Sequence, residues 1–196
     1  TAGGDMNLEG AFLQDGTGTI STAGDITTTN DAITFTDEVT LTGAVALNSG
    51  AAGGTITFKD LLNGTQTLGL TAGTGNIDFD GVVGGVTPLG AVTVNSATNV
   101  TADAAFSAAS FRQVAGSGTT TFTGALATTA AAGVEVDGTN FNFNNTVNLT
   151  LGSLDVDASG TVRFNGVVTT QAAAAGLVTI TNGGVLTITA GGDMNL

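Results

Sequence analysis

The segment Val162-Arg-Phe-Asn-Gly-Val-Val168 decides the fold, because its pattern recurs along the chain at a nearly constant step. The pattern is Phe, any residue, Gly, Asp or Asn, any residue, and then Val or Leu. Its six instances are Phe35–Val39, Phe58–Leu62, Phe79–Val83, Phe122–Leu126, Phe143–Val147 and Phe164–Val168. Their Phe residues are 23, 21, 43, 21 and 21 positions apart. Such a fixed period is the mark of a repeat architecture.

Neighbouring positions complete this series. The step of 43 is two repeats, with Val100 in the vacant slot, and Phe12 extends the series 23 positions before Phe35. The residue two positions before each Phe is usually apolar, and these residues are Ile33, Ile56, Ile77, Phe141 and Val162. Apolar residues two apart point to the same face of a strand. Each repeat therefore contains a short strand, a tight turn and another short strand.

A period near 21 residues with about three short strands predicts an all-β fold, a right-handed parallel β-helix (β-solenoid) of about nine coils of about 21 residues. Like residues then stack on like residues from coil to coil. The expected internal ladder consists of Phe35, Phe58, Phe79, Val100, Phe122, Phe143 and Phe164. A β-sandwich also has short strands, but it does not require Phe at a constant step. The Ala-rich stretch 102–109 is expected to be part of a coil rather than a helix, because Ser107 and Ser110 interrupt it.

One eight-residue sequence occurs exactly at both ends of the printed sequence. Residues 1–8 and 189–196 both read Thr-Ala-Gly-Gly-Asp-Met-Asn-Leu, at an offset of 188. We therefore expect residues 1–188 to be one tandem unit and residues 189–196 to begin the next identical copy. Both ends read as ordinary repeat sequence without a cap, and an uncapped β-helix exposes unpaired strand edges. We expect the chain either to continue covalently or to dock end to end with another copy.

The composition argues against several partners. Hydrophobic residues make up 41%, which is near the globular average and argues against general disorder. Sixteen acidic residues face only three basic ones, Lys59, Arg112 and Arg163, for a net charge of −13. A chain without a basic surface does not suit nucleic acid or anionic lipid. No run approaches the length of a membrane span, so we expect no nucleic-acid partner and no membrane insertion of this segment.

The usual catalytic side chains are nearly absent. The chain has no His, Cys or Tyr and a single Lys, which leaves no Ser–His or Cys–His pair and none of the common zinc ligands. The carboxylate pairs Asp78/Asp80 and Asp155/Asp157 would each face one side of a strand. Polysaccharide-active β-helix enzymes use such carboxylates, but the aromatic platforms of a sugar groove are missing, so this class is the less favoured alternative. We expect no enzyme, no catalytic or metal-binding residues and no cofactor.

Two weaker motifs leave alternatives open. Residues Asp155–Gly160 resemble the start of an EF-hand loop, but Gly166 stands where that loop needs Glu, which leaves only weak surface calcium binding. Thr-x-Thr motifs could line a flat ice-binding face, although Thr is also an ordinary exposed strand residue. These motifs are Thr34/Thr36, Thr55/Thr57, Thr121/Thr123, Thr179/Thr181 and Thr187/Thr189. Asp78, Asp80 and Arg163 would break the regularity of such a face, so ice binding is also less favoured.

The repeated Gly-x-[Ile or Val]-x-Phe-x-Gly strands and the acidic, cysteine-free, Thr- and Asn-rich composition resemble large bacterial exoproteins with tandem β-solenoid repeats. These include filamentous-haemagglutinin-like adhesins and autotransporter passenger domains. The resemblance covers the whole chain and implies secretion to the cell surface or the extracellular space. It implies a structural rod module of a filament, fibre or extracellular-matrix layer whose partners are further copies of itself. The alternative that it leaves open is an adhesin that binds a receptor through the solenoid face.

Overall fold

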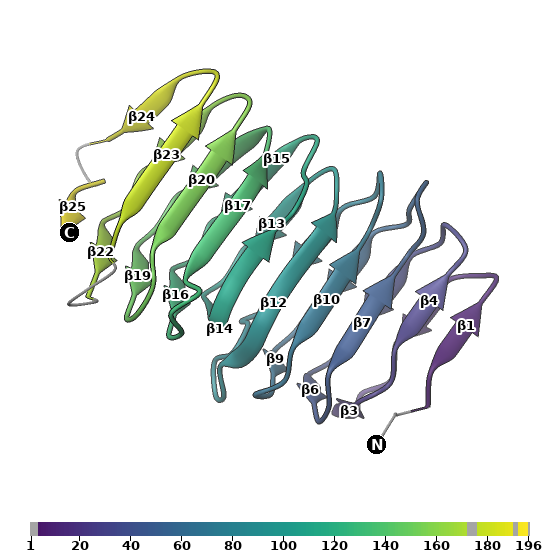
Figure 1. The fold of residues 1–196 in the computed structure, drawn as a ribbon. Coiled ribbons are helices and arrows are strands. Elements are labelled where there is room, and N and C mark those ends of the chain that lie inside the picture. Colours follow the sequence, from purple (N-terminus) through teal and green to yellow (C-terminus); the bar gives the residue numbers. More distant parts are fainter. Residues whose placement is uncertain (1–3, 172–175, 190–191, 196) are drawn as a thin grey trace.

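Stacked coils of short strands build the molecule. The computed structural model describes residues 4–171, 176–189 and 192–195, and these residues form twenty-five strands with no helix among them. The coils follow one another along a single axis, with the N and C ends at opposite ends of the stack (Figure 1). The prediction of an all-β solenoid of about nine coils is confirmed.

Each coil has three sides, and each side pairs in parallel with the same side of the coils before and after it. The first side holds β1 (Met6–Leu8), β4 (Ile26–Thr28), β7 (Val45–Asn48), β10 (Leu68–Thr71), β12 (Leu89–Ser96), the second half of β14 (Phe106–Gln113), β17 (Val134–Gly138), β20 (Leu154–Ala158) and β23 (Val178–Asn182). The second side holds β2 (Phe12–Gln14), β5 (Ile33–Phe35), β8 (Ile56–Phe58), β11 (Ile77–Phe79), β13 (Val100–Ala102), β15 (Thr119–Phe122), β18 (Asn140–Phe143), β21 (Val162–Phe164) and β24 (Leu186–Ile188). The third side holds β3 (Ile20–Thr22), β6 (Val39–Leu41), β9 (Leu62–Asn63), the first half of β14, β16 (Leu126–Thr128), β19 (Val147–Leu149), β22 (Val168–Thr170) and β25 (Met194–Asn195).

Two strands are longer than the others and turn a corner. β12 and β14 have eight residues each, and they run from the third side of one coil onto the first side of the next. In β14, Phe106 pairs with Leu126 on the third side, whereas Phe111 pairs with Val134 on the first. The middle of the solenoid is therefore built differently from the coils around it.

The sequence pattern describes the corner between the second and third sides. Its Phe ends the strand of the second side, and its Val or Leu lies on the third side. The chain between them is held to the preceding coil, as where the amide of Lys59 donates to the carbonyl of Phe35 at 3.0 Å. A Cβ at Gly166 would overlap the backbone of Asn145 in the preceding coil, so only glycine fits there.

The Phe ladder is confirmed for its Phe members. Phe35, Phe58 and Phe79 are register partners on consecutive coils, and all three are buried. Phe122, Phe143 and Phe164 form a second register-paired series on the same side.

Two other expected positions have different register partners from those predicted. Val100 is buried, but it pairs with Ile77, and Ala102 is the residue opposite Phe79. Phe12 pairs with Ile33, and Gln14 is the residue opposite Phe35. The rings of Phe12 and Phe35 nevertheless lie 5.2 Å apart, so Phe12 does extend the aromatic column. The reason in both cases is that strand pairing sets the register, whereas corners differ in length between coils and shift the residue count.

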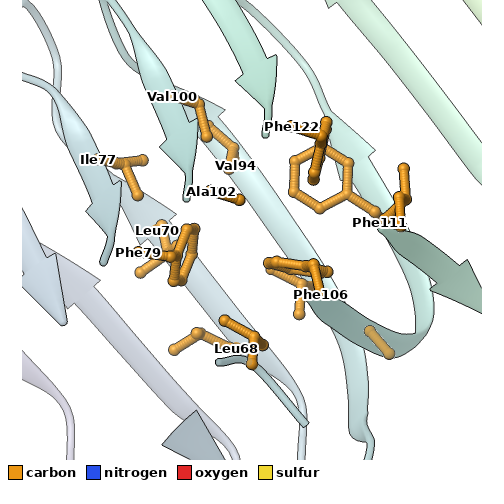
Figure 2. Packing of buried hydrophobic residues seen from close by; sticks show 14 of the residues in the cluster. Leu68, Leu70, Ile77, Phe79, Val94, Val100, Ala102, Phe106, Phe111 and Phe122 are labelled. Carbon is orange, nitrogen blue, oxygen red and sulfur yellow. The ribbon is translucent and has the colours of Figure 1, made fainter. Parts of the chain in front are cut away.

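A ring from another side fills the space at Ala102. The centroid of Phe106 on β14 lies 5.4 Å from that of Phe79 and 5.7 Å from that of Phe122. Figure 2 shows these rings together with Ala102 and Phe111 in the packed core. The aromatic column therefore continues through the coil that lacks a ladder Phe. This segment is strand and corner, which confirms that the Ala-rich stretch 102–109 is not a helix.

Candidate functional site

The outward row of the second side carries one Thr from each of four Thr-x-Thr motifs, whereas Thr179 and Thr181 lie on β23 of the first side. The members of this row, in coil order, are Leu13, Thr34, Thr57, Asp78, Thr101, Thr121, Asn142, Arg163 and Thr187. Thr34 pairs with Thr57, which is the second Thr of the motif on the next coil. Thr36, the second Thr of its own motif, therefore lies opposite Lys59 rather than opposite another Thr. The four motifs on this side therefore contribute to one interrupted row rather than to a two-row array.

The pair Asp78 and Asp80 lies on this side. Asp78 is the outward residue of β11, whereas Asp80 follows the end of that strand and its amide donates to the carbonyl of Phe58 at 2.9 Å. The sequence suggested that both carboxylates would face one side of a strand. The structure does not place them so, because Asp80 lies beyond the end of β11. Burial raises the pKa of Asp78, and the negative charges of Asp80 and Asp103 raise it further.

A concentrated group of charges lies on the first side. Glu135 and Asp137 point outward from β17 and are register partners of Asp155 and Asp157 on β20. We call these four residues the acidic patch. The expectation that Asp155 and Asp157 share one strand face is confirmed. Like charges directly across neighbouring strands are destabilising, so the patch opposes the pairing of these two strands.

Arg112 partly offsets the acidic patch at one edge. Its Nε lies 3.3 Å from Oε2 of Glu135, and both side chains are about half exposed, so the ion pair contributes little to stability. The pKa of Asp137 is raised, mainly by burial and then by the negative charges of Asp157 and Glu135. The positive charge of Arg112 lowers this pKa. Within the described ranges, no group of three or more acidic residues is arranged to hold a metal ion. The patch is a negatively charged surface.

A buried polar pair lies behind this face and was missed by sequence reasoning. Gln113 points inward between Val94 and Val136, in a row of otherwise apolar residues. Its Oε1 accepts a hydrogen bond from Oγ1 of Thr120 at 2.7 Å, and its Nε2 donates to the carbonyl of Asp137 at 3.2 Å. One signal was available, because Thr120 stands two positions before Phe122, where most other repeats have an apolar residue.

A shallow hollow occurs at the corner between the first and second sides. It has a volume of about 370 Å³ and is lined by small side chains and backbone. The lining includes Gly73, Thr74, Ser96, Ala97, Gly116 and Ser117. No charged or aromatic side chain lines it, so it offers little to orient a ligand.

The end coils are the fourth candidate surface. We call β1–β3 the N-terminal end coil and β23–β25 the C-terminal end coil. Their inward residues have a neighbouring coil on one side only, so Met6 is 45% exposed and Ile188 is 48% exposed. Ile77, inward in a central coil, is 0% exposed. Both ends of the described solenoid therefore present a cross-section of the apolar core.

No known protein family, curated protein or solved structure matches this chain. In the part of the chain that the structure describes, no helix is long and apolar enough to cross a membrane.

Proposed function

We propose that this chain is a rigid structural module of a secreted or cell-surface filament, fibre or extracellular-matrix layer, and that it associates end to end with further copies of itself. The observation that carries this proposal is the exact recurrence of residues 1–8 at 189–196, where β25 of the recurring segment stacks on β22 as a further strand of the solenoid. A solenoid coil cannot bury its own apolar face and is stabilised mainly by the coils next to it. A second copy supplies the missing neighbour at each end.

The side chains at the two ends suit each other. Val178, Ile180, Leu186 and Ile188 face inward in the C-terminal end coil, and their counterparts at the other end are also uncharged. Fully burying one Leu or Ile side chain contributes about 1.5–3 kcal/mol. Covering several of them in one contact supports a stable junction.

Charge favours the ends over the sides as contacts. The net charge of −13 makes the side faces of two parallel rods repel each other, and the acidic patch adds to this repulsion. The inward residues of both end coils carry no charge. Because the two ends of the stack differ, a contact between them is head to tail and generates an open filament rather than a closed dimer.

The proposal is tested with a chain that continues residue 188 directly into a second copy of residues 1–196. Small-angle X-ray scattering is expected to show a rod about twice as long as that of the single copy, with the same cross-section. The matched control replaces Leu186 and Ile188 with Asp in the first copy, which blocks the junction but leaves the central coils unchanged. A compact particle, or two independently tumbling units, would contradict the proposal.

Adhesion through the solenoid face is a second candidate, and the acidic patch is the observation that favours it. The patch gathers four carboxylates on one side, which suits a basic receptor surface. Cells that display the rod are compared with cells that display a variant with Gln at 135 and Asn at 137, 155 and 157. Loss of adherence at equal display supports adhesion, and unchanged adherence contradicts a role for the patch.

A further inference from the structure

One short peptide occurs at both ends of the chain but occupies two different places in the coil. Met6 of β1 pairs with Ile26 on the first side. Met194 of β25 lies in a second copy of the same Gly-Asp-Met-Asn sequence, yet it pairs with Val168 on the third side. Identical residues of a tandem repeat therefore stand on different sides of the solenoid.

The number of coils between the two Met residues explains this difference. The inward row that begins at Met6 passes through eight further coils and ends at Ile180 on β23. From there the chain continues along the second side as β24 and reaches the third side as β25. The 188-residue unit thus advances by eight coils and two further sides, which is not a whole number of coils.

We infer that consecutive copies are related by a screw that turns each copy by one side of the coil, with β1 of the following copy in the position of β25. This inference rests on the proposed function, since it requires copies that stack end to end. At the usual strand spacing, the screw carries a rise of about 42 Å per copy. Three copies then restore the original orientation of the sides.

The turn specifies which strands meet at the junction. The second copy's β2 lies over β23, and its β3 lies over β24. Phe12 of the second copy then covers Val178 and Ile180, and Ile20 of the second copy covers Leu186 and Ile188. Each of these contacts places an apolar side chain over one that the C-terminal end coil leaves partly or largely exposed.

The turn also changes what the assembled rod displays. The Phe ladder moves to a different side in each copy, so the stacked rings form separate columns rather than one continuous column. The acidic patches of successive copies also point in different directions. They are therefore not aligned along one face of the rod.

A competing arrangement makes the inference testable. Near the N-terminal end a step of six residues joins the third side to the first, as from Val39 to Val45, and the same step joins Ile188 to Met194. If the second copy's β1 instead lay on the first side, as β1 does in the first copy, its β2 would lie over β24. Successive copies would then not be turned.

The experiment places two nitroxide labels in the two-copy chain, which has no native cysteine. One label is on Leu13→Cys of the second copy, and the other is on Thr179→Cys or on Thr187→Cys of the first copy. These positions point outward from β2, β23 and β24. A Thr34→Cys/Thr57→Cys chain, labelled at two known register partners, shows the dipolar broadening of neighbouring strands.

Strong broadening is expected for the pair with Thr179→Cys and not for the pair with Thr187→Cys. The reverse result overturns the turned junction while leaving end-to-end stacking intact. Absence of broadening in both pairs overturns the junction and the proposed rod together. A cryo-electron microscopy reconstruction of the two-copy chain reads the same three outcomes from the side on which each Phe ladder lies.

Discussion

The aromatic column is built in two ways within one solenoid. In the regular coils, the rings of Phe35, Phe58 and Phe79 stack nearly parallel, with centroids 5.2 and 5.5 Å apart and interplanar angles of 6° and 3°. In the middle of the chain, Phe106 meets Phe79 and Phe122 edge to face, at 84° and 87°. Both geometries are favourable for aromatic pairs.

The difference shows that the core conserves volume more strictly than position. In the regular coils the same residue type recurs at the same register position, so pairing alone brings the rings together. At Ala102 the register position holds a small side chain, and a ring four residues later on another side occupies the space. A close-packed interior tolerates such an exchange when the total volume is kept.

The largest expected effect comes from removing the ring that bridges the two halves. Phe106→Ala should lower the free energy of unfolding by an amount near the upper end of about 3–5 kcal/mol, since it opens a cavity in the column. The ring of Phe106 contacts those of Phe79, Phe111 and Phe122, so several neighbours lose packing at once. Urea unfolding followed by circular dichroism measures this change. A loss below about 1 kcal/mol would mean that the ring does not complete the column.

A regular ladder position should cost less. Phe164→Ala is expected to fall near the lower end of about 3–5 kcal/mol, because its ring stacks on that of Phe143 at one face only. The same urea measurement applies, with Phe106→Ala as the reference. If Phe164→Ala proved more costly than Phe106→Ala, the ranking of the two regions would be reversed.

Restoring the regular pattern in the middle coil tests volume exchange directly. Ala102→Phe alone should destabilise the chain by about 1–3 kcal/mol, because the space is already filled. Ala102→Phe combined with Phe106→Val recreates the arrangement of the other coils. The double variant should be more stable than the sum of the single effects predicts, with a coupling of about 0.5–3 kcal/mol. Strict additivity would show that the two side chains do not share one space.

The buried polar pair is another departure confined to the middle. Gln113→Val leaves the hydroxyl of Thr120 without its acceptor, which should cost about 1–3 kcal/mol. Adding Thr120→Val gives this coil the apolar residues found in the regular ones and should recover much of that loss. A double variant that is less stable than Gln113→Val would show that the pair has a role beyond mutual hydrogen bonding.

The smallest expected effect concerns the acidic patch on the regular coils β17 and β20. The pKa of Asp137 is raised in the folded state, so the native chain binds more protons than the unfolded chain between the ordinary and the raised pKa. This residue therefore makes stability rise as pH falls from neutral, and its contribution is complete below the unfolded pKa.

Asp137→Asn should remove that dependence and change stability at neutral pH by no more than about 0.5 kcal/mol. Unfolding measured between neutral pH and about pH 4 checks the sign. Thr93→Asn on the same side serves as the control. An Asp137→Asn variant whose pH dependence equals that of the unsubstituted chain would contradict the assigned cause.

The sequence predicted the regular coils well because their information is local. A Phe, a Gly, Asp or Asn, and a Val or Leu within five residues specify the end of one strand, a tight corner, and the start of the next strand. Counting residues from one Phe to the next gave the wrong register partners for Val100 and Phe12, because corners of different length shift the register. Only half of the acidic patch could be predicted from the sequence. Asp155 and Asp157 are close in sequence, whereas their pairing with β17 depends on the coil-to-coil register.

The sequence by itself determined the period, the all-β solenoid, the approximate number of coils and the inward Phe rows. These follow from residue type and spacing, which set strand faces and turns without reference to distant parts of the chain. Only the tertiary structure decided that Phe106 fills the space at Ala102, that Gln113 meets Thr120, and that Met194 lies on a different side from Met6. Each of these depends on how many residues every corner uses and on how the enclosed volume is filled, and both are properties of the closed coil rather than of any one segment.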